Sequence, residues 1–498
     1  MKRILLIMAM AIAFTATITA RTTKGKAATV QTTGSLMVMS DIHTMAPSLV
    51  KKTGSAFDNY EKNDMRMIAR SAEILDALVD KVLKLRPAAV LIAGDLTKDG
   101  ELESHQYVVS KLNQLQAQGI RVLVVPGNHD ISNPNAKIFD GDKTLPAETI
   151  DRDMFTHLYA DFGYASDSNY DLNSLSYVTE VLPGLVLIAI DSNRDEENLL
   201  KSRGDSIDSY HNGGRIKPET MQWIAEQAAQ ARAQGKQVIA MMHHHAVQHV
   251  DREQSLLPNY IVANAEKVRD QLMEAGIHLL LTGHLHVNDI ALNYNSAATD
   301  SIYEIATGSA ITYPFAYRLL SPSKDLKKIG VKTEYITSTP SCKNLKEAGR
   351  KRLEHGANAL ATMAANRLWN RLDGKLGKVS GMLALFEAPI KLPQTAQELQ
   401  AITMKYFDKP LQQVVMEFAE ADESSRDNTH ILNDFRTCFK GMIGDMLPDE
   451  GGYISNFLLE EFYPKLEPLL KSVIEDRNQC GTSHETVVRD LNTTLELR

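Results

Sequence analysis

The chain has 498 residues, of which 43% are hydrophobic and 23% are charged, which excludes a fibrous or disordered protein and allows more than one domain. Its formal net charge is -8, and it has no dense basic run to which the phosphate backbone of a nucleic acid polymer could bind. A small nucleotide is not excluded as a ligand.

The N-terminus has the pattern of an export signal. Two basic residues precede an apolar stretch over residues 4–14, and small residues lead to a cleavage point after Ala20. The stretch is shorter than the about 20 residues that a membrane span needs, so we expect no stable membrane span. We predict a signal peptide at 1–20, a linker at 21–34, and a periplasmic or extracellular location. An uncleaved N-terminal anchor is the alternative.

Apolar runs alternate with amphipathic stretches in the first two thirds of the chain. Six runs predict buried strands, at residues 36–39, 88–93, 122–125, 185–190, 238–242 and 278–281. Helices are predicted over about 68–82 and around 107–115. Strands that alternate with helices indicate a layered α/β core, in which ligands bind at the carboxyl ends of the strands. Each run stops at a polar residue, so we predict one shared site.

From residue 340 to 498 the strand-like runs almost disappear, and we predict a separate, mainly helical region without chemistry of its own. Residues 343–372 and 457–473 have helical patterns, and Pro464 and Pro468 are expected to interrupt or kink the second.

The three cysteines are too few for a disulfide scaffold and are not grouped as metal ligands. One bridge, between Cys438 and Cys480, could form after export and would leave Cys342 unpaired. Three unpaired thiols are the alternative, and the oligomeric state is open.

The residues at these strand ends offer oxygen and nitrogen ligands and no thiolate. They are Asp41, His43, Asp95, Asn128, His129, His243, His284 and His286. Such a set suits Mn, Fe or Zn better than a cysteine-rich structural zinc site. In Asp-x-His and His-x-His, two side chains lie on one face of an extended segment, so each pair addresses one metal pocket. A carboxylate such as Asp95 can bridge two ions.

Two metal ions about 3.5–4 Å apart would clamp a phosphate and turn a bound water into hydroxide near neutral pH. They would also offset the charge of the phosphoryl transition state. His129 is placed to donate a proton to the leaving oxygen, and we expect Asp130 to orient it.

Five motifs follow one another along the chain: Asp41-x-His43, Gly94-Asp95, Gly127-Asn128-His129-Asp130, a histidine at 243–245, and Gly283-His284-Leu285-His286. Together they resemble the ordered motifs of the calcineurin-like metallophosphoesterases, over about residues 35–320. The resemblance implies an α/β fold with a layered metallophosphoesterase-type β-sandwich flanked by helices over residues 35–339.

The resemblance also implies two ligand sets that share Asp95. The first metal would be held by Asp41, His43, Asp95 and His286, and the second by Asp95, Asn128, His243 and His284. His129 would be the acid that contacts the phosphate. Within the family, the Gly94–Thr97 segment, the Asp191-Ser192 strand end and the glycine-rich turn at 213–216 are similar to the class III cyclic-nucleotide phosphodiesterases.

One departure concerns the fourth motif, because relatives often read His-His-Pro-Pro where this chain reads His243-His244-His245-Ala246. We favour His243 as the ligand because it ends its strand, with His244 as the second choice. His245 is then a candidate for substrate binding. His211, beside a glycine pair, is another, with a solvated loop histidine as the alternative.

We therefore predict an exported hydrolase that cleaves a small phosphodiester or phosphomonoester by attack of a metal-bound hydroxide at a dinuclear centre. The cofactors are two divalent or trivalent ions (Mn, Fe or Zn), whose identity is open. The alternative is a metal-binding scaffold or binding module of the same fold without turnover.

Overall fold

The computed structural model describes residues 34–62, 64–165, 168–198, 210–250, 253–356, 393, 395–421, 427–446, 453–474 and 490–497. The predicted signal peptide at 1–20 and nearly all of the linker at 21–34 lie outside these ranges. So does Cys480, the candidate partner of Cys438 in the bridge alternative. Among the described residues, no helix combines the length and apolar character needed to cross a membrane.

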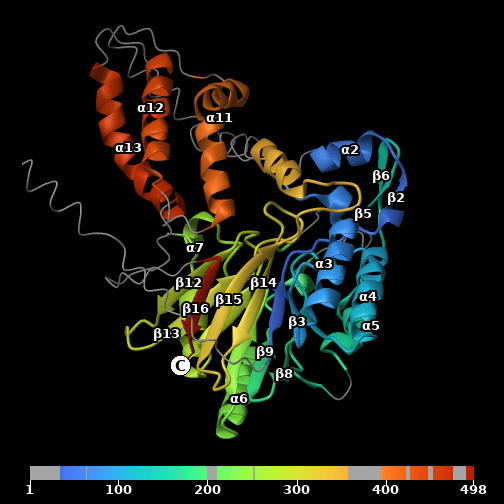
Figure 1. Ribbon diagram of the computed structural model, residues 1–498. Helices are drawn as coiled ribbons and strands as arrows, with labels where there is room; N and C mark the ends of the chain where they lie inside the picture. The colour runs from blue at the N-terminus through green and yellow to red at the C-terminus, as the bar shows by residue number, and fades with distance from the viewer. Residues whose placement is uncertain are drawn as a thin grey trace, which may run out of the picture.

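Two sheets form the centre of the molecule (Figure 1). The first has six strands in the order β16-β15-β14-β1-β3-β4. Their bounds are β1 Leu36–Met39, β3 Ala89–Ala93, β4 Arg121–Val125, β14 Ala316–Pro322, β15 Lys328–Tyr335 and β16 Asn492–Glu496. Strands β1, β3 and β4 run parallel, and β14, β15 and β16 continue the sheet in antiparallel pairs.

The second sheet has seven strands in the order β12-β13-β11-β10-β9-β8-β7. Their bounds are β7 Asn169–Tyr170, β8 Tyr177–Leu182, β9 Leu185–Ala189, β10 Gln237–Met241, β11 Leu279–Thr282, β12 Asp289–Tyr294 and β13 Ser301–Ala306. Its centre, β9-β10-β11-β13, is parallel. The carboxyl ends of these strands therefore lie along one edge.

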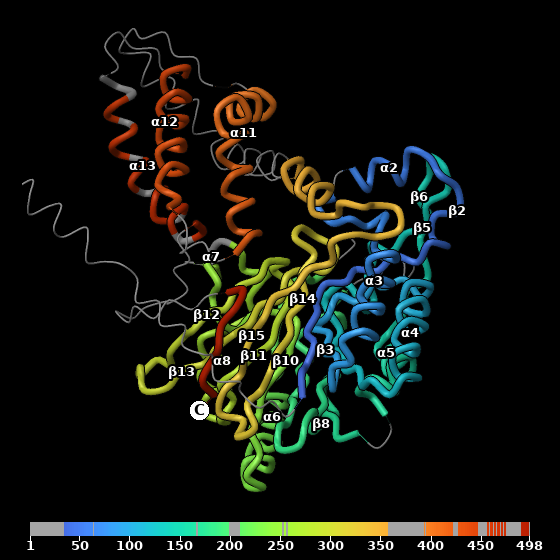
Figure 2. Tube along the Cα trace, in the orientation of Figure 1, coloured from blue at the N-terminus to red at the C-terminus, as the bar shows by residue number. Residues whose placement is uncertain are grey.

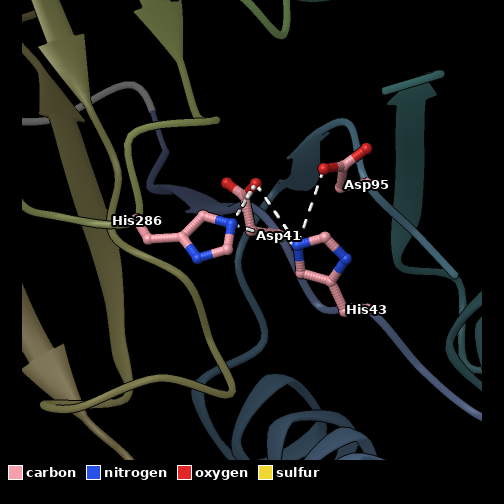
Figure 3. A group of neighbouring side chains, drawn as sticks. All are labelled: Asp41, His43, Asp95 and His286. Carbon is pink, nitrogen blue, oxygen red and sulfur yellow. Dashed lines mark hydrogen bonds and ion pairs between the residues drawn. The ribbon is translucent and has the colours of Figure 1, made fainter. Parts of the chain in front are cut away.

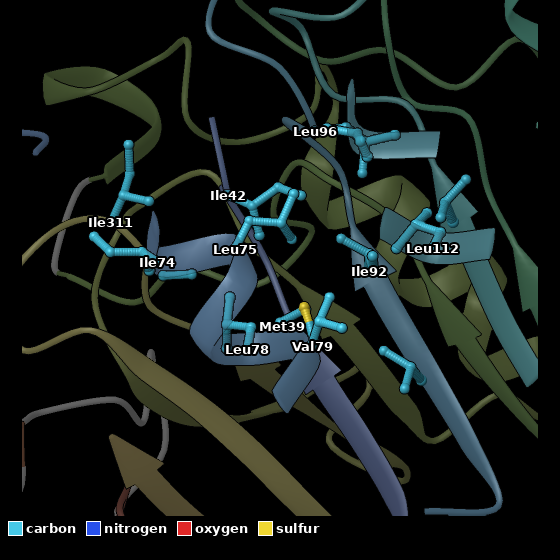
Figure 4. Packing of buried hydrophobic residues seen from close by; sticks show 14 of the residues in the cluster. Met39, Ile42, Ile74, Leu75, Leu78, Val79, Ile92, Leu96, Leu112 and Ile311 are labelled. Carbon is cyan, nitrogen blue, oxygen red and sulfur yellow. The ribbon is translucent and has the colours of Figure 1, made fainter. Parts of the chain in front are cut away.

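The two sheets pack face to face because each central strand is apolar on both sides. In β1, Leu36 and Val38 point into the core between the sheets. Met37 and Met39 alternate to the outer face and pack against α3 (Ser71–Leu85), as Figure 4 shows for Met39.

Helices cover both outer faces of the sandwich. Helices α3 and α4 (Leu102–Gln116) cover the first sheet, and α6 (Pro218–Ala233) and α8 (Ala265–Glu274) cover the second. The predicted layered sandwich flanked by helices is thus confirmed. The smaller elements are the sheet β2 Val50–Lys52, β5 Lys137–Asp140 and β6 Lys143–Pro146, the helices α2 Ser55–Lys62, α5 Arg152–Leu158 and α7 Glu253–Leu256, and the 3-10 turns η1 Pro47–Leu49, η2 Ile68–Arg70, η3 Ala160–Phe162 and η4 Asp195–Glu197.

Three long helices near the C-terminus form a group of their own, as the tube in Figure 2 shows. They are α11 Ala396–Glu420, α12 Thr429–Met446 and α13 Tyr453–Ile474, and they pack on one another through a separate apolar cluster. Helix α13 continues through Pro464 and Pro468, so these prolines do not interrupt it, and a kink at them stays a prediction. Residues 345–356 are helical, and the rest of the helix predicted at 343–372 lies outside the described residues.

The prediction that residues 340–498 form a separate, mainly helical region needs one correction. Strand β16, close to the C-terminus, returns to the first sheet and pairs with β15. Leu495 of β16 joins the core between the sheets. The last strand of the chain therefore belongs to the sandwich.

Candidate metal centre

Every predicted metal ligand lies in a loop that leaves the carboxyl end of a parallel strand. Asp41 and His43 follow β1, Asp95 follows β3, and Asn128 follows β4 in the first sheet. His243 follows β10, and the His284–His286 segment follows β11 in the second. Because the sheets face each other with these edges adjacent, the loops bring the side chains together between them.

The first cluster consists of Asp41, His43, Asp95 and His286, whose ligand atoms all lie within 4.8 Å of one another (Figure 3). The Nε2 atoms of His43 and His286 are 3.1 Å apart. Asp41 Oδ1 lies 3.2 Å from Nε2 of His286, and Asp95 Oδ2 lies 3.5 Å from Nε2 of His43. Four ligand atoms thus surround one point.

The second cluster consists of Asp95, Asn128, His243 and His284. Nε2 of His243 lies 3.2 Å from Asp95 Oδ2 and 3.0 Å from Asn128 Oδ1. The ligand atoms of Asp95, His243 and His284 also lie within 4.8 Å of one another. Asp95 Oδ2 faces imidazoles of both clusters, which is the position that a bridging carboxylate needs.

Backbone carbonyls fix which nitrogen of each second-cluster histidine is free. Nδ1 of His243 donates to the Ala93 carbonyl at 2.9 Å, so its Nε2 keeps a lone pair toward the cluster. Nε2 of His284 donates to the Asn259 carbonyl at 3.0 Å, which leaves Nδ1 for a ligand. A second hydrogen bond of this kind is typical of histidines that bind metals.

Five of the ligands have left-handed backbone conformations. The φ angles are 51° at Asp41, 34° at His43, 51° at Asp95, 67° at His284 and 65° at His286. Asp and His tolerate this region better than most residues, but each such conformation still costs about 1–3 kcal/mol. Strain of this size, repeated at one point, is characteristic of a functional site.

Glycines in the motifs allow the loops to approach closely. A Cβ on Gly127 would overlap the carboxylate of Asp95, and a Cβ on Gly94 would overlap the ring of His243. Since Gly94 also has a φ of 86°, a side chain at this position would be strained as well as crowded. The glycines therefore keep the two clusters in contact.

The donor set fits metal ions. Oδ1 of Asp41 is buried without a hydrogen-bond partner, and the carboxylates of Asp41 and Asp95 have almost no exposed surface. Burial lowers the pKa of His243, but the charge of Asp95 outweighs burial and raises that pKa to about 9. The clusters therefore attract positive charge, and their oxygen and nitrogen atoms suit Mn, Fe or Zn.

His129 lies beside the first cluster, with its ring centroid 4.8 Å from that of His43. Its backbone N–H donates to Asp95 Oδ1, and its Nδ1 faces Asp99 Oδ1 and the Lys98 carbonyl at 2.9 and 2.8 Å. Nδ1 is thus occupied, and Nε2 remains for a substrate. Burial lowers the pKa of His129, but the charges of Asp95 and Asp99 raise it above its ordinary value.

The prediction that Asp130 orients His129 is wrong. The Asp130 carboxylate accepts from the backbone N–H groups of Leu96, Thr97 and Gly127, so it braces the loops and faces away from the imidazole. Asp99 holds the imidazole instead. Sequence reasoning missed Asp99, whose only signal was its place four residues after a predicted ligand.

The three consecutive histidines, 243–245, have three different sets of partners. His243 reaches the second cluster, as predicted. His244 is held by the Ser192 hydroxyl at Nδ1 and the Asn212 carbonyl at Nε2. His245 is fully buried and bonds Glu304 at 2.7 Å, so the prediction that it contacts substrate is wrong. The backbone N–H of His211 donates to Asn198, and its role stays a prediction.

Two further residues at the site gave no sequence signal. Nη1 of Arg66 lies 3.1 Å from Nδ1 of His43, and Asp64 pairs with the guanidinium at 2.7 Å. The Tyr210 hydroxyl accepts from Nδ2 of Asn128 at 2.6 Å, which turns the amide oxygen toward the second cluster. Both contacts join segments that only the fold brings together.

Comparison with known proteins gives one family match. The sequence profile of the family described as calcineurin-like phosphoesterase matches residues 34–288, about half of the chain. The chain belongs to this family. The matched segment contains every predicted metal ligand.

A relative from Ruthia magnifica subsp. Calyptogena magnifica, named "Probable cyclic nucleotide phosphodiesterase", is 33% identical over 95 residues. The match covers 19% of this phosphoesterase and 38% of the relative's length. A dimetal phosphatase from Danio rerio has a TM-score of 0.41 at 14% identity, over 61% of this chain and 96% of that chain. A purple acid phosphatase from yellow lupin (Lupinus luteus) has a TM-score of 0.34 at 12% identity. The match covers 60% of this chain and 51% of that chain.

Proposed function

We propose that this phosphoesterase is an exported enzyme that uses a dinuclear metal centre to hydrolyse a small phosphodiester, with phosphomonoesters as the second substrate class. The observation that carries the proposal is the pair of ligand clusters that share Asp95. A single carboxylate between two sets of imidazoles would hold two ions close enough to act on one phosphate.

When bound, two such ions supply an activated water as the nucleophile and offset the negative charge that develops on the phosphoryl oxygens. The chain contributes position and a proton. Asp99 holds Nδ1 of His129, so Nε2 is directed to the leaving oxygen and can protonate it as the ester bond breaks. Asn128 is oriented by Tyr210 and contributes an oxygen to the second cluster.

A phosphodiester is favoured by the name of the Ruthia magnifica relative, a probable cyclic nucleotide phosphodiesterase, and by the matching sequence segments described above. The ligand set accepts Mn, Fe or Zn, and selection among them depends on geometry and availability. A small ester is favoured over a nucleic acid polymer because the chain carries a net charge of -8.

The direct test is turnover of bis-p-nitrophenyl phosphate and p-nitrophenyl phosphate by protein loaded with Mn²⁺, together with the metal content per chain. We expect about two ions per chain and faster turnover of the diester. Asp95→Ala should abolish binding of both ions and lower kcat/KM by about a thousandfold, since metal catalysis supplies several kcal/mol. Two tightly held ions without turnover of any ester would support the scaffold alternative.

Export is supported by the basic start and apolar stretch at residues 2–14. Cell fractionation and N-terminal sequencing of the full-length product would test it. We expect a mature chain that begins at Arg21 in the periplasmic or extracellular fraction. A cytoplasmic product that retains Met1 would contradict export and leave the hydrolytic proposal intact.

A further inference from the structure

A second buried polar group lies behind the metal clusters, between the second sheet and its helices. It consists of His245, His249 and Glu304, none of which has more than 1% exposed surface. Glu304 lies on β13, on the same face as Ile302, which packs under α8 in the outer core. Burial of an ionised carboxylate this deep is costly unless several donors satisfy it.

Five donors reach the Glu304 carboxylate. Oε1 accepts from Nδ1 of His245 at 2.7 Å, Nε2 of His249 at 3.1 Å and the Thr282 hydroxyl at 2.9 Å. Oε2 accepts from the backbone N–H groups of Ala246 at 3.0 Å and Val247 at 2.8 Å. Burial raises the pKa of Glu304, but the bonds from the two histidines outweigh burial and hold that pKa below its ordinary value.

Hydrogen bonding, rather than a third metal ion, accounts for this group. The Glu304 carboxylate already accepts from five protein donors, which fill the about four lone-pair sites that a carboxylate offers. The 2.7 Å between His245 and Glu304 is the length of a strong hydrogen bond. His249 completes the network, because its Nδ1 lies 3.2 Å from the carboxylate of Asp289.

The five donors belong to the two segments that carry the histidines of the second cluster. His245, Ala246, Val247 and His249 lie two, three, four and six residues after His243 in the chain. Thr282 ends β11 and precedes His284 by two residues. Glu304 therefore joins both segments to a third strand, β13, which itself carries no predicted ligand.

The same network reaches His284 by a second route. The backbone of His245 pairs with the 260–262 segment. The His245 N–H donates to the Tyr260 carbonyl at 3.2 Å, and the His245 carbonyl accepts from the Val262 N–H at 2.8 Å. The preceding carbonyl, that of Asn259, is the group that fixes His284. Movement of His245 would therefore displace the acceptor that selects the coordinating nitrogen of His284.

We propose that Glu304 is a positioning residue for the second metal cluster, which holds the His243 and His284 segments in the geometry that binds one of the two ions. The inference rests on the proposed dinuclear function, but it concerns metal affinity at one cluster and no atom of Glu304 contacts substrate. Residues that orient metal ligands from outside typically change metal affinity or activity by about 10–100-fold when mutated.

Glu304→Gln tests this role with little change of side-chain volume. The amide NH₂ replaces one acceptor oxygen with a donor that faces other donors, so the hydrogen bonds on that side of the carboxylate are lost. We expect the second ion to leave at about tenfold lower chelator concentration than in the wild-type protein, while the first ion is retained as before. The readout is bound Mn²⁺ per chain during titration with a chelator. Excess Mn²⁺ should restore kcat of Glu304→Gln with KM nearly unchanged, and Glu304→Asp should be intermediate.

Asp171→Asn is the matched control. Asp171 is 2% exposed, and its carboxylate accepts from the Thr220 and Ser174 hydroxyls at 2.6 and 2.7 Å and from the backbone N–H of Asn173. None of these three partners belongs to either metal cluster. The variant should lose stability without a change in metal retention. If Glu304→Gln does not fold, Thr282→Val removes one donor at similar volume and should shift retention of the second ion in the same direction by a smaller factor.

Two results would overturn the proposal: metal retention in Glu304→Gln equal to that in Asp171→Asn, or a third ion in the wild-type protein that Glu304→Gln loses. Both are read from metal content alone. Absence of turnover on every ester would refute the proposed function and leave this measurement interpretable.

Discussion

The two metal clusters share Asp95 but differ in what surrounds their histidines. In the second cluster, the outer nitrogens of His243 and His284 donate to backbone carbonyls. In the first, the outer nitrogen of His43 faces the guanidinium of Arg66. A guanidinium only donates, so it cannot accept the proton that Nδ1 of His43 carries when Nε2 coordinates a metal.

This difference indicates that one half of the centre is organised before a metal arrives and the other is not. The second cluster has its lone pairs fixed by main-chain atoms, which do not move with side-chain rotamers. The first requires Arg66 or His43 to shift. We therefore expect the second ion to bind more tightly, and the first to leave first when a chelator is added.

The largest effect is expected from removal of one histidine from either cluster. His243→Ala and His43→Ala should each lower kcat/KM by about 100- to 1000-fold, because one-ion catalysis remains at best. They should differ in metal content: His43→Ala keeps about one tightly held ion, and His243→Ala keeps one weakly held ion. Equal affinity for the remaining ion in the two variants would contradict the asymmetry between the clusters.

A smaller effect is expected at Asp99, which orients the proposed acid and belongs to neither ligand cluster. Asp99→Asn should slow hydrolysis of alkyl phosphodiesters by about tenfold, a part of the 10²–10⁴-fold that general acid catalysis supplies. Esters of p-nitrophenol, whose leaving group needs little protonation, should be affected much less. Asp195→Asn, at a buried carboxylate that pairs with Arg152, serves as the control. An equal loss on both substrate types would rule out the role of Asp99.

Arg66→Gln tests the difference between the two clusters most directly. The glutamine oxygen can accept from Nδ1 of His43, as the Ala93 carbonyl does for His243, so the first ion should resist chelation several-fold better. Bound metal per chain is the measurement. Arg152→Gln changes a partly buried arginine elsewhere, which binds Asp191, and should leave metal retention unaltered. Weaker retention in Arg66→Gln would show that the guanidinium supports the cluster rather than opposing it.

The smallest effect concerns the stability of the fold in acid. His105 belongs to neither ligand cluster, so its protonation changes the free energy of unfolding without removing a metal ligand. Burial lowers the pKa of His105 to about 4. Because the unfolded chain then binds more protons between about pH 6.5 and pH 4, stability falls as the pH drops through this window and is unaffected above it. At pH 5.5 the loss is about 1 kcal/mol. Urea denaturation should show that His105→Gln lacks this dependence, while its activity at pH 7 is retained.

Much of the centre was predictable because each ligand directly follows a strongly apolar strand. The apolar runs at 88–93 and 238–242 predict strands within about one residue of the observed bounds, 89–93 and 237–241, and parallel strands bring their polar ends to one edge. Periodicity also located α3 correctly. Helix α4 begins five residues earlier than expected, since its first turn is polar and gives no apolar repeat.

The positions that escaped prediction depend on contacts between distant segments. Glu304 lies 59 residues from His245 in the chain and reads as one polar residue inside an apolar strand. Asp130 is adjacent to His129 in the chain, whereas Asp99 lies 30 residues away, and only the fold shows that the distant carboxylate faces the imidazole. The short strand β16, rich in Thr, has a pattern too brief to stand out beside long helices.

Because β16 returns to the first sheet, the three long helices form an insertion between two strands of the sandwich rather than a C-terminal extension. The chain leaves the first sheet after Tyr335, and it comes back where Leu491 accepts from Thr333 at 2.8 Å. Exit and re-entry are therefore neighbours, and a brief linker can join them. Excision of the intervening segment keeps the sheet whole, whereas a stop codon near residue 340 also strips β16 and turns β15 into an unprotected edge.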